Sequence, residues 1–209
     1  MPPTRKPRSR IGEINSGRIL DAALGVFAHH GFSGSRLDEI AAAAGMSKPN
    51  LLYYFRSKDA LYRAVLTRTL ELWLEPLREL DPNGDPRAAF SHYIRRKLAY
   101  SRSHPDGSRL FAIEIMQGAP HLAHVLSGEL AVLFDLKCKL IRRWIAEGRL
   151  SDIDPHHVLF AIWATTQHYA DFAAQIRTLT GKDFNDEAFF ENAARAIETI
   201  LLEGLLPRP

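Results

Sequence analysis

With 209 residues, 46% of them hydrophobic, the chain is long enough to bury a core, in one domain or two small ones, without a disulfide or structural metal. The single cysteine excludes a disulfide scaffold, and the lack of an apolar run near the ~20 residues of a membrane span excludes a membrane protein. No signal peptide is expected, so these features together indicate a cytoplasmic location. The net charge of +3 is uneven, because residues 1–60 hold nine Lys/Arg and five Asp/Glu; this favours a nucleic acid as partner, although a solvated surface carries such charge too.

The chain begins with a proline-rich basic stretch without apolar periodicity, which predicts a disordered arm over residues 1–14. Such an arm can contact phosphates or the minor groove of DNA, or it can be an incidental tail. Apolar residues at helical spacing then predict a first helix from Asn15 to His30, ended by Gly31.

A second helix is predicted over about residues 36–44. Ser35 can cap its N-terminus, with Asp38 three residues later as the reciprocal partner in a capping box. Gly45 ends this helix, since glycine adopts the left-handed conformation at the lowest cost.

A third, short helix is predicted over about residues 48–54. Ser47 can cap it, and Pro49 is tolerated in its first turn because the backbone nitrogen there has no helical partner in any case. Two short helices joined by a tight glycine turn predict a helix-turn-helix, in which the start of the second helix reads the major groove. The alternative is a helical hairpin in the core of a bundle.

The side chains of this segment discriminate between the two interpretations. Packing needs only a few of its apolar residues, namely Ile40, Ala44, Leu51 and Phe55. Four other side chains have no evident packing role: Lys48, Asn50, Tyr53 and Tyr54. Cations suit phosphate oxygens and an Asn amide suits the edge of adenine, so these side chains favour DNA binding.

Residues 44–58, AGMSKPNLLYYFRSK, resemble the signature of the TetR family of bacterial repressors, with Pro49 where the family often has Gly and Leu52 where it often has Tyr. The resemblance implies a helix-turn-helix head over residues 15–60 and a ligand-binding, dimerising body over residues 61–209. It implies a DNA-binding transcriptional regulator, most often a repressor. The residues expected to contact DNA are Arg36, Ser47, Lys48, Pro49, Asn50, Leu52, Tyr53, Tyr54 and Lys58.

The rest of the chain also reads as helices, which predicts an all-α fold with about nine helices and no strands. Ser57 can cap a long helix that continues towards Pro76. Later helices, separated by loops rich in Asp, Pro and Gly, are expected at about residues 86–101, 108–117, 121–147, 155–179 and 186–206.

The last two predicted helices, 155–179 and 186–206, carry apolar stripes wider than one neighbouring helix can cover. An exposed apolar surface of that size predicts a homodimer formed through these helices. A two-fold dimer presents two recognition helices, so the expected operator is an inverted repeat in double-stranded DNA.

Trp163 and Gln167 lie one turn apart on one face of helix 155–179. In a pocket, the indole could stack on a flat ring, and the carboxamide, with one donor and one acceptor side, could make two bonds to a pyrimidine-2,4-dione edge. Trp73, on the helix that Ser57 caps, could supply a second flat wall. The alternative is core packing, with Gln167 bonded to a neighbour.

Four stretches of the body are similar to the pyrimidine-utilisation repressor subgroup of the TetR family: residues 109–120, 153–157, 162–172 and 200–208. This resemblance implies uracil or thymine as the effector, and it matches Trp73, Trp163 and Gln167 to ligand-contacting positions. Because bodies in this family diverge quickly in ligand, a different small apolar or aromatic effector is the alternative.

No pattern indicates an enzyme, a metal or a cofactor. Of the nine histidines, His121 and His124 lie three residues apart and His156 adjoins His157, but neither pair has the further ligands of a metal site. No nucleotide-binding or hydrolase motif occurs. The alternative from another class is a helical binding or scaffold protein without DNA activity, which the basic head argues against.

Overall fold

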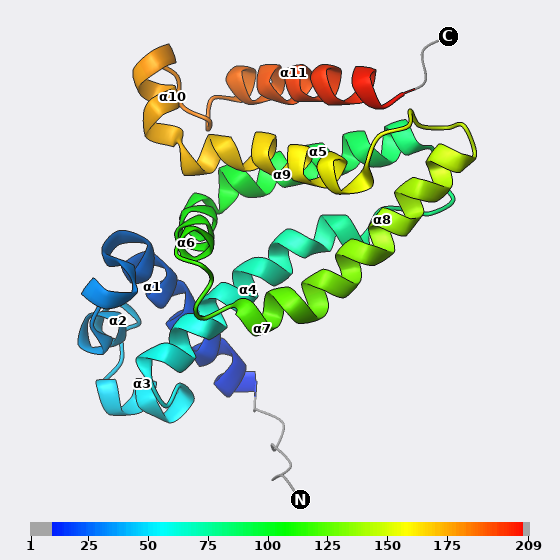
Figure 1. Cartoon of the computed structure of the whole chain (residues 1–209). Coiled ribbons are helices and arrows are strands. Elements are labelled where there is room, and N and C mark those ends of the chain that lie inside the picture. The colour runs from blue at the N-terminus through cyan, green and yellow to red at the C-terminus, as the bar shows by residue number, and fades with distance from the viewer. Residues whose placement is uncertain (1–9, 207–209) are drawn as a thin grey trace, which may run out of the picture. The chain divides into compact units, whose positions relative to one another are not determined.

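The computed structural model describes residues 10–206, and most of the arm expected over residues 1–14 lies outside this range. Every secondary-structure element in the described range is a helix and none is a strand, which confirms the all-α prediction (Figure 1). The chain divides into two compact units, residues 1–68 and residues 69–209. Among the helices of the described range, none is both long and apolar enough to cross a membrane.

The first unit contains the predicted helix-turn-helix. Its elements are α1 (Arg10–Gly34), α2 (Leu37–Ala43), α3 (Lys48–Tyr54) and the first part of α4 (Lys58–Arg78). α1 begins at Arg10, before the predicted start at Asn15, because no proline interrupts this stretch and Glu13 places a carboxylate in the first turn, where the helix dipole favours it. Gly31, with φ 67° and ψ 178°, interrupts the helical geometry at the predicted end of this helix.

The cap of α2 differs from the prediction by one residue. The N-cap is Arg36, whose backbone N–H donates to the Glu39 carboxylate at 3.2 Å, so Ser35 and Asp38 do not form the expected capping box. The Ser35 hydroxyl instead donates to the carbonyl of Phe32 at 2.9 Å, and it is therefore committed to the chain before α2. Glu39 takes the role predicted for Asp38 because it lies three residues after the N-cap Arg36, the spacing that a capping box requires.

The cap of α3 is as predicted. The Ser47 hydroxyl accepts from the backbone N–H of Asn50 at 3.4 Å, and Pro49 lies in the first turn. Phe27 and Tyr62 pack edge to face in the core of this unit, with ring centroids 4.9 Å apart. The four apolar residues predicted to pack in the helix-turn-helix are all buried: Ile40, Ala44, Leu51 and Phe55.

The second unit is an all-helical body. Its elements are the rest of α4, then α5 (Pro86–Ser103), α6 (Pro105–Met116), α7 (Ala123–Val125), the π-helical segment η1 (Leu126–Leu130), α8 (Ala131–Ala146), α9 (Pro155–Asp171), α10 (Ala173–Thr180) and α11 (Glu187–Leu205). Asp85, Asp154 and Asp186 cap three of these helices with their carboxylates.

Two helices predicted as continuous are divided in the structure. The helix expected over residues 121–147 is interrupted by η1, in which Gly128 leaves helical geometry with φ −98° and ψ −105°. The helix expected over residues 155–179 breaks at Phe172, where φ is −113° and ψ is 28°. No glycine or proline marks the second break, so the apolar period alone gives no sign of it.

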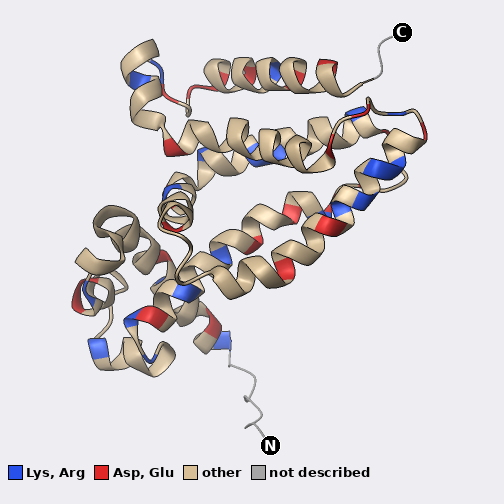
Figure 2. Ribbon diagram, viewed as in Figure 1, with Lys and Arg blue, Asp and Glu red and all other residues tan. Residues whose placement is uncertain are grey.

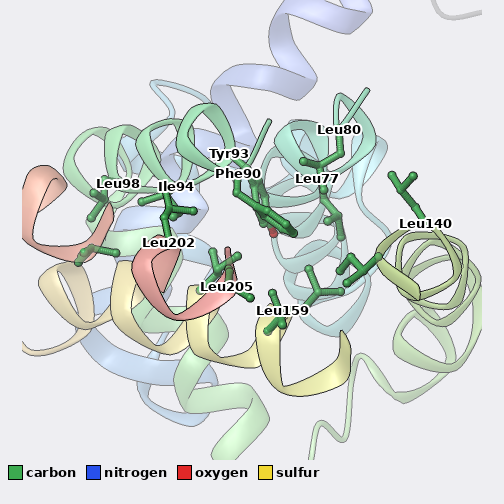
Figure 3. Packing of buried hydrophobic residues seen from close by; sticks show 14 of the residues in the cluster. Leu77, Leu80, Phe90, Tyr93, Ile94, Leu98, Leu140, Leu159, Leu202 and Leu205 are labelled. Carbon is green, nitrogen blue, oxygen red and sulfur yellow. The ribbon is translucent and has the colours of Figure 1, made fainter. Parts of the chain in front are cut away.

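α5 is the central helix of this body and packs against α6, α9 and α11. Its buried residues meet leucines from the neighbouring helices in one apolar core (Figure 3). Cys138 of α8 lies in this core as a free thiol with no exposed surface, and burial raises its pKa.

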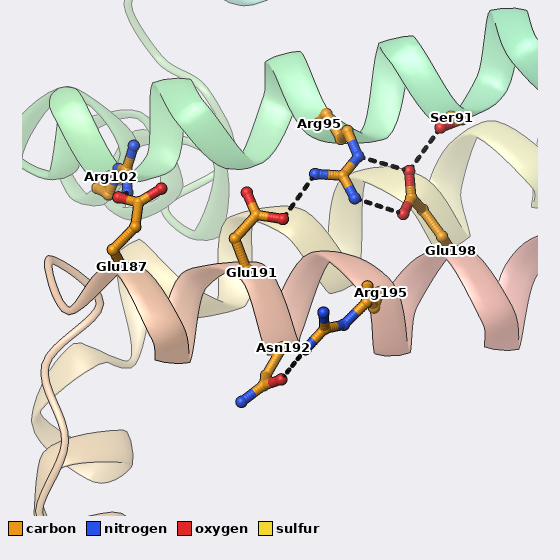
Figure 4. A network of polar contacts seen from close by, with 8 residues as sticks. All are labelled: Ser91, Arg95, Arg102, Glu187, Glu191, Asn192, Arg195 and Glu198. Atoms are coloured by element: carbon orange, nitrogen blue, oxygen red, sulfur yellow. Dashed lines mark hydrogen bonds and ion pairs between the residues drawn. The ribbon is translucent and has the colours of Figure 1, made fainter.

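A polar clamp joins α5 to α11 at the edge of the core (Figure 4). The Arg95 guanidinium donates from Nε and Nη2 to the two carboxylate oxygens of Glu198, both at 2.9 Å, and from Nη1 to Glu191 at 3.0 Å. Ser91 donates to Glu198 as well. A bidentate Arg–carboxylate pair fixes direction as well as distance, so this clamp sets the position of α11 on the body.

Candidate DNA-binding surface and ligand pocket

The start of α3 presents polar and aromatic side chains to solvent. Lys48, Asn50 and Tyr53 are exposed, and 82% of the Tyr53 side chain is accessible. Of the other residues expected to contact DNA, Arg36, Ser47 and Pro49 are exposed, whereas Leu52, Tyr54 and Lys58 are half-buried. The exposed residues of this set do not pack in the core, so their side chains are accessible to a ligand as large as a DNA duplex.

Lys48 forms an ion pair with Asp38 of α2, with Nζ 2.9 Å from the carboxylate. Both side chains are largely accessible, so solvent weakens the pair, and exposed pairs contribute only ~0–1 kcal/mol to stability. A phosphate can therefore take the ammonium from Asp38 at little cost. The pair holds Lys48 beside the turn between α2 and α3.

Lys58 has a structural role that the sequence did not reveal. Its ammonium donates to the carbonyls of Phe32 at 2.7 Å and Ser35 at 3.0 Å, and it lies 4.7 Å from the centroid of the Phe32 ring. These bonds tie the start of α4 to the end of α1 and the link that follows it. An ammonium has three N–H groups, so one donor remains for a phosphate.

Two further contacts fix the helix-turn-helix on α1. The Tyr54 hydroxyl accepts from the Asn15 amide at 3.0 Å, which orients that ring. Arg18 donates to the carbonyl of Ala44 at 2.6 Å, directly beside Gly45, whose φ is 66°. A Cβ at Gly45 would lie 2.9 Å from the tip of the Arg18 side chain, which can move aside only by disturbing its bond to Ala44, so the positive φ is the main reason for glycine in this turn.

The charge of this unit is positive over the described residues. Residues 10–68 hold eight Lys/Arg and five Asp/Glu, and both signs occur along the helices (Figure 2). Three more basic residues of this unit, Arg5, Lys6 and Arg8, lie outside the described range. The positive excess suits a polyanion such as the DNA backbone.

The body contains a small, mostly apolar cavity of about 50 Å³. Its walls are Leu70, Trp73 and Leu74 of α4, Lys97 of α5, Phe111 of α6, Leu130 of η1, and Trp163 and Gln167 of α9. The structure thus brings Trp73, Trp163 and Gln167, the three residues expected to contact a ligand, to one cavity. Since one water needs about 10–15 Å³ by this measure, the space suits a single small ring.

Trp163 is held in place by a partly buried hydrogen bond. Its indole N–H donates to the Tyr93 hydroxyl at 2.7 Å. Tyr93 is 1% exposed, and burial raises its pKa, so the hydroxyl stays protonated. The bond fixes the ring plane of Trp163, which a stacking wall requires.

Lys97 is a wall residue that the sequence analysis missed. It is 2% exposed, and its Nζ lies 3.7 Å from the centroid of the Trp73 ring. Burial lowers its pKa to about 7, and the charge of Asp171 opposes that shift. The sequence held a signal: Lys97 follows Ile94 by three residues and Tyr93 by four, on the buried face of α5.

Asp171 lies at the end of α9. It accepts a short hydrogen bond from the Ser108 hydroxyl of α6, and burial raises its pKa. Across the part of the chain that the structure describes, no group of three or more His, Cys, Asp or Glu side chains could hold a metal ion.

Comparisons with known proteins agree over both units. Residues 19–65 match the family model described as bacterial regulatory proteins, tetR family, and residues 66–208 match the C-terminal region of YcdC-like proteins. The chain is 48% identical over 205 residues to the HTH-type transcriptional regulator RutR of Escherichia coli K12, which covers 98% of this chain and 97% of that protein. It is 27% identical to the HTH-type transcriptional repressor SCO4008 of Streptomyces coelicolor, over 92% of this chain and 98% of that one.

Solved structures show the same fold. A TetR-like transcriptional regulator from Rhodococcus sp. RHA1 superposes with a TM-score of 0.68 at 27% identity, over 96% of this chain and 98% of that one. AibR, solved in complex with isovaleryl coenzyme A and operator DNA, superposes with a TM-score of 0.69 at 16% identity, over 90% and 97% of the two chains.

Proposed function

Because the chain belongs to the TetR family of transcriptional regulators, we propose that it binds an operator through α3 and releases it when a small planar effector enters the cavity beside Trp163. One observation carries the proposal. Trp73 of α4 lines one cavity with Trp163 and Gln167 of α9, about 90 residues later in the chain, and two of the three side chains are flat aromatic rings. As the target is DNA, we place the protein in the cytoplasm.

At the operator, Asn50 is the candidate for base contact, and Lys48, Tyr53, Tyr54 and Lys58 are candidates for phosphate contact. Asn50 is exposed in the first turn of α3, the part of a recognition helix that reaches base edges. Asn50→Ala should relax discrimination at one base position by ~1–3 kcal/mol. Lys48→Ala should weaken binding to every sequence alike and flatten the salt dependence. Equal affinities of both variants and the parent for one operator would refute these roles.

The proposed effector is a pyrimidine-2,4-dione, uracil or thymine. A carboxamide can accept from its N–H and donate to its carbonyl at the same time, and Gln167 is half-buried at the cavity. In about 50 Å³ the extra methyl of thymine finds little room, so uracil should bind more tightly. Another small apolar or aromatic ring is the alternative.

The effector signal can travel along α4. This helix runs without interruption from Lys58 to Arg78 and carries Trp73 in its second half. A ligand that binds more tightly to one tilt of α4 shifts the balance towards that state, and such couplings are typically ~1–3 kcal/mol.

A homodimer through α9 to α11 completes the proposal. These helices and the break between α9 and α10 expose large apolar side chains, among them Phe160, Phe172, Leu179 and Ile200. Ile200→Glu should give monomers in sedimentation, whereas Val132→Glu on α8, a position equally exposed at 71%, should leave the dimer intact. A dimer that survives Ile200→Glu would place the interface elsewhere.

The test is a uracil titration into the complex of the protein with its own upstream DNA, followed by gel shift. Wild-type protein should release the DNA. Gln167→Ala should bind DNA normally but need roughly ten-fold or more uracil, because the ring edge loses its partner in a buried site. Gln117→Ala, an exposed position at the end of α6, is the matched control. A complex that survives saturating uracil and thymine would refute the pyrimidine assignment.

A further inference from the structure

Lys97 is a buried cation without a hydrogen-bonded partner in the protein. It is 2% exposed and lines the cavity, and within residues 10–206 its Nζ donates to no acceptor. Two interactions offset part of the cost of burying this charge: the face of the Trp73 ring, 3.7 Å away, and the more distant carboxylate of Asp171. An ammonium with three donors and no acceptor from the protein is costly at the wall of a mostly apolar cavity unless an acceptor enters that cavity.

A second buried lysine in the same body provides a comparison, because its ammonium is engaged in structural hydrogen bonds. Lys137 of α8 is 6% exposed, and its ammonium donates to the carbonyls of Arg78 at 3.0 Å and Leu80 at 3.1 Å. Lys97 has comparable burial but makes no such bonds. The difference points to an acceptor that comes from outside the chain.

The surroundings of Lys97 leave the cavity as the source of that acceptor. The residues that line the cavity with Lys97 from α4, α6 and η1 are apolar: Leu70, Trp73, Leu74, Phe111 and Leu130. From α9 come Gln167 at the cavity and Asp171, which already accepts from Ser108 and has the charges of Arg109 and His168 near it.

We infer that Lys97 is a recognition group of the effector pocket, which donates a charge-assisted hydrogen bond to a carbonyl oxygen on the ring edge of the effector. This inference rests on the proposed function. The ligand class is a planar ring that carries carbonyl oxygens, read by two side chains, the Lys97 ammonium and the Gln167 carboxamide. A purely apolar ring of the same size would leave both groups unpaired and should bind poorly.

Effector binding should then depend on pH. The pKa of Lys97 is about 7, so the ammonium is mostly present at pH 6 and mostly absent at pH 8. Binding that requires the ammonium should weaken about ten-fold between these pH values. Uracil stays neutral over this range, so the change reports on the protein. Asp171 is the titratable group whose charge acts on this amine, and Arg109 and His168 lie near Asp171 in turn.

The experiment measures uracil binding by calorimetry at pH 6 and pH 8. Lys97→Met keeps the aliphatic length and removes the amine; it should lose about ten-fold to a hundred-fold in affinity at pH 6 and show no pH dependence. The matched control is Lys139→Met, an exposed position of α8 paired with Asp135, which should behave as wild type. Equal affinity and an equal pH profile for Lys97→Met and wild type would overturn the inference and leave the pyrimidine proposal intact.

A second measurement decides the inference without a ligand. The thermal midpoint of ligand-free Lys97→Met at pH 6 should be no lower than that of Lys139→Met, because an unpaired buried charge has been removed. A clearly lower midpoint would make Lys97 a structural residue and overturn the inference. If wild-type protein does not bind uracil, the pyrimidine proposal fails, and this measurement still decides the role of Lys97.

Discussion

Lys58→Met should destabilise the first unit rather than act only on DNA affinity. The variant loses two hydrogen bonds from a charged donor to the carbonyls of Phe32 and Ser35, at 2.7 Å and 3.0 Å, and the contact with the Phe32 ring. Bonds to a charged group contribute ~1.5–3 kcal/mol each, and the half-buried position favours the low end. With ~0.5–1 kcal/mol for the ring contact, the free energy of unfolding should fall by about 3–4 kcal/mol.

For a chain of this length, such a loss corresponds to a fall in the thermal midpoint of roughly 6–15 °C. Circular dichroism during heating measures this value. Lys48→Met is the matched control, because its exposed pair with Asp38 contributes ~0–1 kcal/mol and the midpoint should move little. Both variants should lower the salt slope of DNA binding, by about one for each phosphate contact. A wild-type midpoint for Lys58→Met would refute the structural role, and only the phosphate role would remain.

Three further predictions concern other contacts. Gly45→Ala places a Cβ at a φ of 66° and displaces the Arg18 group that bonds the carbonyl of Ala44, so it should cost ~1–3 kcal/mol of stability and weaken operator binding, measured by denaturation and gel shift. Lys97→Met should raise the stability of the ligand-free protein most below pH 7, by at most ~5 kcal/mol, because the pKa of Lys97 falls from 10.5 to about 7 on folding. The gain should shrink between pH 7 and 10.5, where Lys97 is already neutral in the folded protein, and a gain that grows with pH would refute this sign. Glu198→Gln should cost ~1–3 kcal/mol by weakening the bidentate pair with Arg95, and an unchanged urea midpoint would contradict this.

Local rules predicted the helix-turn-helix well because its signals lie within a few residues of each other. Ser47, three residues before Asn50, can cap only the helix that follows, and the structure contains that bond. The same rule failed at Ser35 because the hydroxyl had a competing acceptor, the carbonyl of Phe32, which local sequence does not reveal. The break at Phe172 was missed for a similar reason, since it carries no local signal.

The cavity was predicted only in part. Trp163 and Gln167 share one helix, so their proximity follows from spacing, whereas the approach of Trp73 from α4 is a tertiary contact that helical spacing cannot give. Lys97 was missed because a charged residue is normally assigned to the surface. Its place on the apolar face of α5, between Ile94 and Ser101, was the sign of a buried amine.

The buried thiol of Cys138 makes this chain convenient for spectroscopic labelling. It is the one cysteine of the sequence, and burial both shields it and disfavours its reactive thiolate. A cysteine introduced at the exposed Ala43 of α2 would therefore react first with a nitroxide reagent, without removal of the native residue. In a dimer the two labels form one pair, and pulsed electron paramagnetic resonance would measure the distance between the two helix-turn-helix units with and without effector.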